Sequence, residues 1–176
     1  MTQYAVLTAI GPDKPGLVDA ISRFILDHQC NIEDSQMGVL GGEFAMLILV
    51  SGQETPVRAV LESASAAGEQ VGLTVQGRIT QLPGEEAVKS LPYTVSAFAM
   101  DHPGIVQKVA HLLSGFAVNV RALETRTDNA PVSGQPLFAL HAIIDIPATV
   151  KIAEVRRGLE ELGDAENIDI ELKPEA

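Results

Sequence analysis

The chain contains one short motif twice, in the same register. Residues 11–18 read GPDKPGLV and residues 99–106 read AMDHPGIV, so the two aspartates are 88 residues apart (101 − 13). Asn31-Ile32 recurs as Asn119-Val120 with the same offset (119 − 31). Several separate matches in one register indicate an internal duplication. The 176 residues therefore divide into two modules of roughly 80 residues each, a size that can fold alone.

Each module has the hydrophobic pattern of a β-α-β-β-α-β unit. Short apolar runs predict strands, and apolar residues at helical spacing predict two helices per module. In the first module the strands are expected over 5–10, 32–40, 43–50 and 73–80, with helices over 15–28 and 57–64 and a Gly41-Gly42 hairpin turn. In the second module the strands are expected over 93–99, 118–127, 137–146 and 168–172, with helices over 105–116 and 152–162. This order predicts an α+β protein with two tandem ferredoxin-like domains, each with two helices on one face of an antiparallel sheet.

The domain limits follow from the repeat. We expect the first domain over 1–81, a linker over 82–92 and the second domain over 93–176. The linker holds two prolines, a glycine and clustered charge, which is typical of a connector, although 85–89 suits a short helical turn.

The second strand of each module is expected at a sheet edge. It carries Glu33 and Asp34 in the first module, and Arg121 and Arg126 in the second. Opposite charges on equivalent edges favour pairing of the two halves over self-pairing of either. The sequence therefore predicts one continuous eight-stranded sheet, and the alternative is two solvated edges with unrelated charges.

Composition excludes several classes of protein. The net charge of −11 disfavours direct binding of nucleic acid, because such a surface repels phosphates. The single cysteine, Cys30, rules out a Cys-x-x-Cys site and is interpreted as a small buried apolar residue. The longest apolar run, 44–50, is too short to span a membrane, and the N-terminus lacks a signal-peptide pattern. We therefore expect a cytoplasmic protein that does not contact membranes.

No catalytic set is evident in the sequence. It contains neither a Gly-x-Ser-x-Gly elbow nor a phosphate-binding Gly-Lys-Ser/Thr loop. The four histidines lack metal-ligand spacing, and His28 and His111 are interpreted as structural or surface residues. We expect no metal, no cofactor and no enzymatic activity. A small enzyme that uses Asp101 and His102 as acid–base groups is the least favoured alternative.

The repeated loop is the main candidate for a ligand site. It lies between a strand and a helix, where unpaired N–H groups and the helix dipole favour a carboxylate. Glycine permits close approach to the backbone, and Asp13 or Asp101 offers a partner for an ammonium group. These properties fit a free amino acid. The alternative is that the aspartates only cap the helices. Asn31 and Asn119 follow the first helix of each module, where a carboxamide could contact the same ligand or simply form a turn.

These motifs resemble ACT domains, over nearly the whole chain. Two such units with no catalytic domain resemble tandem ACT proteins of the glycine cleavage system transcriptional repressor type. The resemblance implies regulatory modules that bind small amino acids at interfaces between ACT units. Carried over by position, the ligand-binding residues would be Asp13, Lys14, Pro15, Gly16, Leu17, Asn31 and Ile32, and Asp101, His102, Pro103, Gly104, Ile105, Asn119 and Val120.

The resemblance also implies partners. The effector would be glycine or a similar small amino acid, and the target a protein partner such as a transcriptional regulator. It leaves open whether the chain forms a homodimer, and whether its loops bind nothing and the protein is a structural interaction module. The two sites need not be equal, because Lys14 is replaced by His102 and Glu33 by Arg121. The loop over 128–136 is long and polar, so it is either functional or a tolerated insertion.

Overall fold

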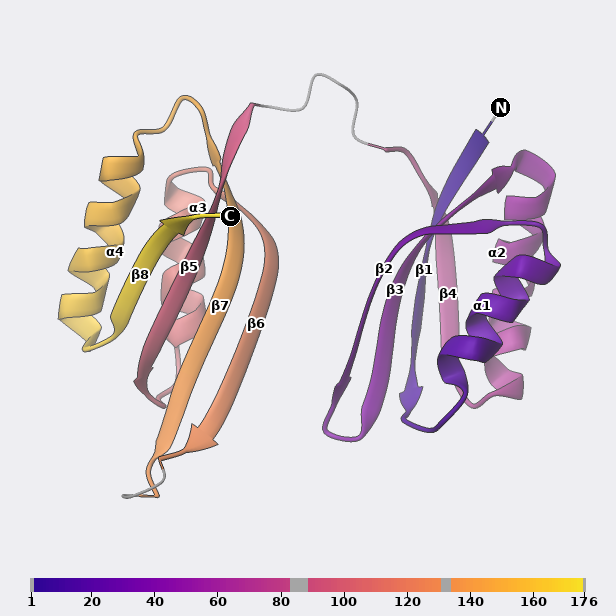
Figure 1. Cartoon of the computed structure of the whole chain (residues 1–176), viewed down its shortest axis with the longest axis horizontal. Helices are drawn as coiled ribbons and strands as arrows, with labels where there is room; N and C mark the ends of the chain where they lie inside the picture. The colour runs from indigo at the N-terminus through magenta and orange to yellow at the C-terminus, as the bar shows by residue number, and fades with distance from the viewer. Residues whose placement is uncertain (1, 83–88, 131–133, 176) are drawn as a thin grey trace. The chain divides into compact units, whose positions relative to one another are not determined.

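The computed structural model describes residues 2–82, 89–130 and 134–175. It divides into two compact units, residues 1–84 and 85–176 (Figure 1). Each unit contains four strands and two helices in the order β-α-β-β-α-β, as the sequence predicts. The α+β class and the ferredoxin-like topology are therefore confirmed.

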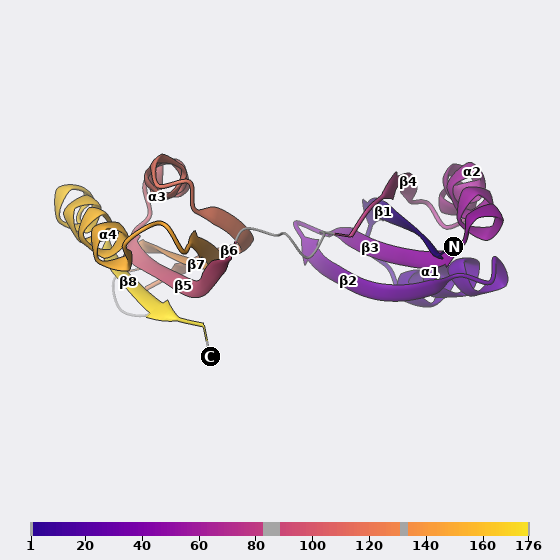
Figure 2. The same ribbon diagram turned by 90° about the horizontal axis from the view of Figure 1, so that it is seen from above.

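In the first unit a four-stranded antiparallel sheet has the strand order β2-β3-β1-β4. Its elements are β1 (Thr2–Pro12), α1 (Leu17–Asp27), β2 (Asn31–Leu40), β3 (Glu43–Gln53), α2 (Glu54–Gln70) and β4 (Thr74–Thr80). The hairpin between β2 and β3 turns at Gly41 and Gly42, which both have positive φ. Both helices lie on one face of the sheet, which Figure 2 shows end-on.

The second unit repeats this topology, with the strand order β6-β7-β5-β8. Its elements are β5 (Ser90–Met100), α3 (Ile105–Gly115), β6 (Asn119–Asn129), β7 (Pro136–Pro147), α4 (Ile152–Glu166) and β8 (Asp169–Pro174). The long polar loop predicted over 128–136 includes residues 131–133, which lie outside the described residues.

The core of each unit lies between its sheet and its helices. Alternate residues of the central strands face the helices, so Ala5, Leu7 and Ala9 of β1 are almost fully buried. Leu17, Ile21 and Ile25 of α1 cover them, at the spacing that the sequence predicts. The second unit has an equivalent core. Cys30 belongs to the first core, as expected, and burial raises the pKa of its thiol.

The predicted eight-stranded sheet is wrong. The described strands form two separate four-stranded sheets, and each ladder stays within its own unit. The edge charges that suggested pairing are used inside each unit. Glu33 accepts hydrogen bonds from Asn31 and Ser51, and Arg121 forms ion pairs with Asp145 and Glu175. Each of these charged side chains therefore has its partners within its own unit and needs none from the other.

The positions at which the strands end and begin shorten the predicted linker between the domains. The last strand of the first unit ends at Thr80 and the first strand of the second unit begins at Ser90. Ser90, Leu91 and Pro92, which the sequence assigned to the linker, are therefore strand residues. The helical turn considered over 85–89 lies almost entirely outside the described residues.

None of the helices in the described part of the chain has the length and apolar composition needed to cross a membrane.

Candidate functional site

The two repeated loops form the same backbone turn. Gly16 has φ 94° and ψ −2°, and Gly104 has φ 101° and ψ −6°, values that favour glycine over residues with a Cβ. Asp13 donates its N–H to the Gly42 carbonyl and Asp101 donates to the Pro136 carbonyl, both at 2.9 Å. In each unit the turn is therefore fastened to the neighbouring hairpin in the same way.

Both helices that follow the turns begin without a side-chain cap. The N-cap residues are Gly16 and Gly104, and neither helix has a side-chain hydrogen bond that caps its N-terminus. The first helical bonds are donated by Ala20 to Gly16 and by Lys108 to Gly104, each at 2.9 Å. The amides before these donors have no acceptor in the helix. The interpretation of Asp13 and Asp101 as helix caps is therefore wrong.

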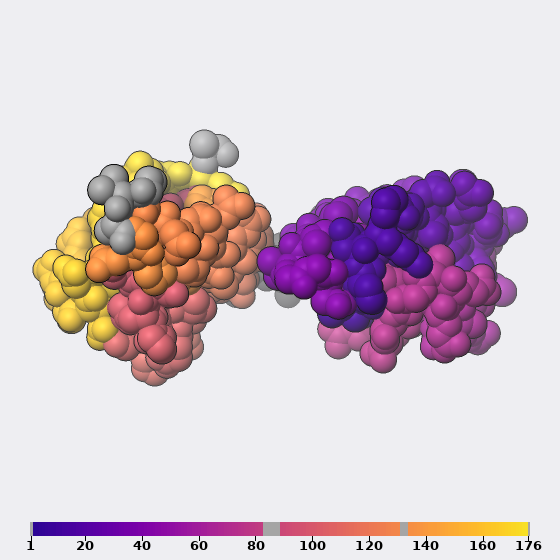
Figure 3. All heavy atoms as spheres, turned by 90° about the horizontal axis from the view of Figure 1, so that it is seen from below, coloured from indigo at the N-terminus to yellow at the C-terminus, as the bar shows by residue number. Residues whose placement is uncertain are grey.

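The turns are exposed and anchored by one buried residue each. In the first unit residues 13–16 are exposed, whereas Leu17 is 2% exposed and packs in the core. The second unit has exposed Asp101, Pro103 and Gly104 above a buried Ile105. Figure 3 views the ends of the sheets that carry these turns, and the indigo atoms of the first turn lie uncovered at the surface. A small ligand can reach the turns from solvent.

The side chains of the two turns differ in their surroundings. Lys14 Nζ lies over the turn between α2 and β4, 3.8 Å from the position of a Cβ at Gly72. In the second unit His102 Nδ1 donates to the carbonyl of Pro103 at 3.2 Å. Asp101 and His102 form no hydrogen bond or ion pair with each other in the structure, so the side chains of the acid–base alternative are not coupled.

Asn31 and Asn119 lie at the opposite ends of their sheets from the turns. Asn31 is in register with Ser51, which is in register with Tyr4, whereas the first turn follows Pro12. Eight residues of strand separate Tyr4 from Pro12, which corresponds to about 26 Å. The asparagines are the first residues of β2 and β6, and Ile32 and Val120 follow them. One small ligand cannot contact the turn and the asparagine of the same unit.

Asn31 belongs to a polar cluster that the sequence did not reveal. Its amide donates to Glu33 Oε1 at 3.1 Å, and the Ser51 hydroxyl donates to the same oxygen. The hydrogen bond from Ser51, and next that from Asn31, hold the pKa of the Glu33 carboxyl below its usual value. The cluster depends on a β-bulge between Ile32 and Asp34, which sequence periodicity does not show.

The second unit carries a bulge at the same point, between Val120 and Ala122. The bulged residue there is Arg121, which pairs with Glu175 and lies 3.9 Å from Asp145. The bulged residue is thus an acidic side chain, Glu33, in the first unit and a basic side chain, Arg121, in the second. The first residues of β2 and of β6 therefore offer different chemistry to a ligand.

An open depression of about 900 Å³ lies beside Asn31. It is formed by the ends of α1 and β3, the first residues of α2, and Thr2 at the start of β1. Its lining residues are Thr2, Leu26, Gln29, Cys30, Asn31, Ser51, Gly52, Gln53, Glu54 and Thr55. The described residues contain no group of three or more His, Cys, Asp and Glu side chains suited to a metal ion.

The geometry of the chain agrees with comparisons to known proteins. Residues 3–77 match the model of an ACT domain. The glycine cleavage system transcriptional repressor of Escherichia coli is 29% identical over 162 residues, which cover 90% of this chain and 83% of the repressor. A UPF0237 protein of Methanopyrus kandleri is 42% identical over 73 residues, which cover 40% of this chain and 81% of that protein.

Solved structures share the whole two-unit fold. A crystal structure of an unknown protein from Galdieria sulphuraria is 27% identical with a TM-score of 0.84, and the match covers 100% of both chains. A putative glycine cleavage system transcriptional repressor is 22% identical with a TM-score of 0.73, covering 98% of this chain and 97% of that one; this match supports the fold. The chain is therefore a tandem ACT-domain protein related to the glycine cleavage system transcriptional repressor.

Proposed function

We propose that the protein is a regulatory protein without enzymatic activity, which binds a small amino acid at its repeated turns and modulates a partner protein. The observation that carries this proposal is the exposed, uncapped helix start beside an aspartate, which occurs twice with the same backbone geometry. The relationship to a transcriptional repressor supports a transcriptional regulator as the partner. We further propose a cytoplasmic location, with no cofactor and no direct contact with nucleic acid.

The chemistry of the turn suits both charged ends of an amino acid. The free amides and the positive end of the helix dipole favour the carboxylate. Asp13 or Asp101 lies at the same turn and would receive the ammonium group. A Cβ at Gly16 or at Gly104 would meet no backbone atom within 4 Å, so the surface of the turn is open to a ligand. Glycine is the first candidate, in line with the repressor to which the chain is related.

A complete site is best supplied by ACT units of two copies of the chain. The turn and Asn31 lie at opposite ends of one sheet, but antiparallel pairing of two edges places the start of one strand beside the end of the other. Strand β2 is such an edge, and its last residue, Leu40, is in register with Glu43 and through it with Pro12. An edge-to-edge homodimer would therefore bring Asn31 of one copy near the turn of the other.

A ligand at such an interface would regulate by stabilising one assembly. Regulation requires only that the amino acid binds the paired form more tightly than the separate form. A protein partner that recognises one of the two forms would then respond to the amino acid concentration. No catalytic step is needed.

The two turns should differ in affinity. The first turn of α1 contains Asp19, whose carboxylate competes with a bound anion for the helix N-terminus. The first turn of α3 contains no acidic residue. We expect the second turn to bind the carboxylate more tightly than the first.

Calorimetric titration with the twenty amino acids tests the proposal, with sedimentation velocity in parallel. Binding of glycine or a similar small amino acid that is lost in Asp101→Asn, and that promotes a dimer, supports it. Lys151→Gln is a matched control because Lys151 is an exposed charge outside both turns. Absence of binding at millimolar concentration would leave a structural interaction module, and product formation would indicate an enzyme.

A further inference from the structure

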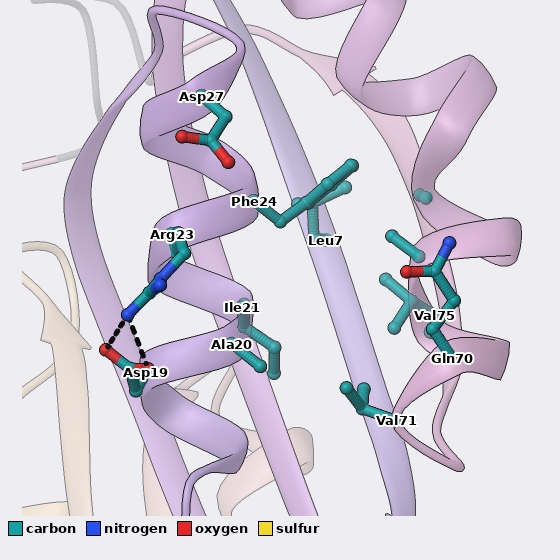
Figure 4. A pocket seen from close by; sticks show the side chains of 13 residues that line it. Leu7, Asp19, Ala20, Ile21, Arg23, Phe24, Asp27, Gln70, Val71 and Val75 are labelled. Atoms are coloured by element: carbon teal, nitrogen blue, oxygen red, sulfur yellow. Dashed lines mark hydrogen bonds and ion pairs between the residues drawn. The ribbon is translucent and has the colours of Figure 1, made fainter.

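A groove of about 400 Å³ lies between α1 and α2 in the first unit, on the helix side of the sheet. Its floor and walls are apolar, and its rim carries the charged groups of α1 and Gln70 of α2. The lining residues are Leu7, Asp19, Ala20, Ile21, Arg23, Phe24, Asp27, Ala64, Ala67, Gly68, Gln70, Val71 and Val75. Figure 4 shows Phe24 and Ile21 on α1, with Leu7 behind them and Val71 and Gln70 across the groove. The groove contains none of the turn residues.

The second unit shows why the first has this groove. Gly68 and Gly163 occupy equivalent positions, because a Cβ at either would lie 2.6 Å from the carbonyl oxygen of the residue five positions later. This equivalence aligns Ala64 with Leu159 and Ala67 with Leu162. Leu159 is 2% exposed, and Leu162 packs against the core. The first unit therefore has two alanines where the second unit fills the same space with leucines.

The residues at the rim of the groove also differ between the two units, and they are again smaller in the first. In the second unit Lys108 of α3 forms an ion pair with Glu166 of α4. The offset of the turns aligns Lys108 with Ala20, and the offset of the glycines aligns Glu166 with Val71. Both Ala20 and Val71 line the groove. The ion pair that connects the helices in one unit is thus absent from the equivalent positions of the other.

We propose that the groove between α1 and α2 is a second ligand site, which binds a small molecule with an apolar body and an ammonium group. The volume is within the range of small-molecule sites, and apolar side chains form most of the lining. This site is separate from the turns and does not rest on their function.

The charges at the rim select the cation. Asp19 and Arg23 pair with each other at 3.1 Å, whereas Asp27 forms no hydrogen bond or ion pair among the described residues. The rim groups Asp19, Arg23 and Asp27 therefore sum to one net negative charge, located at Asp27. An ammonium group at Asp27 would place the apolar body between Phe24 and Val71. Free apolar amino acids and simple apolar amines both have this chemistry.

Two probes distinguish the sources of that chemistry: L-phenylalanine and phenethylamine. Binding to the full chain is followed by NMR shifts of backbone amides around the groove. The double variant Ala64→Leu/Ala67→Leu copies the second unit and should abolish binding. Asp27→Asn should weaken it by about two- to fivefold, because the ion pair is exposed. Asp13→Asn is the matched control, since it alters the turn and leaves the groove intact.

A second variant covers the case in which the double leucine variant does not fold. Ala20→Lys/Val71→Glu copies the rim ion pair of the second unit without changing the floor, and should also reduce binding. Binding of either probe that is lost in the groove variants and kept in Asp13→Asn supports the proposal. Absence of binding by both probes at 10 mM, or binding that the folded groove variants leave unchanged, would overturn it; neither outcome bears on the turns.

Discussion

Replacement of Gly104 by alanine tests whether the backbone conformation of the turn, with its positive φ, requires glycine. Gly104 has φ 101°, a conformation that alanine disfavours, and a Cβ built there comes no closer than 3.8 Å to a neighbour, the flexible side chain of Lys108. The substitution therefore adds no steric clash with packed atoms. Any loss of stability must come from the positive φ at the start of α3.

The expected loss is about 1 kcal/mol. A residue with a Cβ in the left-handed region costs about 1–2 kcal/mol, and alanine recovers about 0.4–1 kcal/mol by restricting the unfolded chain. For a unit of this size, 1 kcal/mol lowers Tm by roughly 4–8 °C. Gly16→Ala should have the same effect on the first unit, because its φ is 94°.

Thermal unfolding followed by NMR signals assigned to each unit is the appropriate assay, because two units need not unfold together. Gly115→Ala is the control. Gly115 ends the same helix, has open space around it and lacks a positive φ, so alanine there should stabilise by up to about 1 kcal/mol. A Gly104→Ala variant as stable as the parent, or equal shifts in both variants, would refute the argument.

Three further predictions concern single side chains. Ser51→Ala should raise the pKa of the Glu33 carboxyl, measured by NMR titration, and an unchanged pKa would contradict the hydrogen bond. Because folding lowers this pKa, the stabilisation from Glu33 is present above the unfolded value near 4.5 and is lost as the pH falls. Gly68→Ala should destabilise the first unit by about 1–3 kcal/mol in urea unfolding, because its Cβ would lie 2.6 Å from the Leu73 carbonyl oxygen; equal stability would refute this contact. Cys30 should react slowly with a thiol reagent until urea unfolds the chain, because it is 6% exposed and burial raises its thiol pKa; rapid reaction of the folded protein would contradict this.

The sequence was sufficient for the order and type of the elements. Periodicity identified the helices and strands, and the repeated Asp-x-Pro-Gly pattern located both turns, because glycine is required where φ is positive. The strands extend a few residues beyond the apolar runs, as in β1, which begins at Thr2 and ends at Pro12. The hydrogen-bonded strand pairing continues through polar residues on either side of the apolar run.

The assignment of Asn31 to the same site as the turn failed for a topological reason. A helix that returns along the sheet places the start of the next strand at the end opposite the turn, and this follows from the predicted order of elements. The eight-stranded sheet failed for another reason. Glu33 and Arg121 bind partners inside their own units, and the register that creates those contacts contains a bulge without a sequence signal.

At the bulge, β2 has one residue more than the segment of β3 with which it pairs. Ile32 and Asp34 face neighbouring positions of β3, Val50 and Leu49, so Glu33 is the surplus residue. Deletion of Glu33 would leave the alternation of residues 34–40 intact and restore a regular ladder. Deletion of Gly38 would instead invert Val39 and Leu40 at the end of the strand. Tolerance to shortening is therefore concentrated at one residue of this edge, and natural length variation in β2 should be found there.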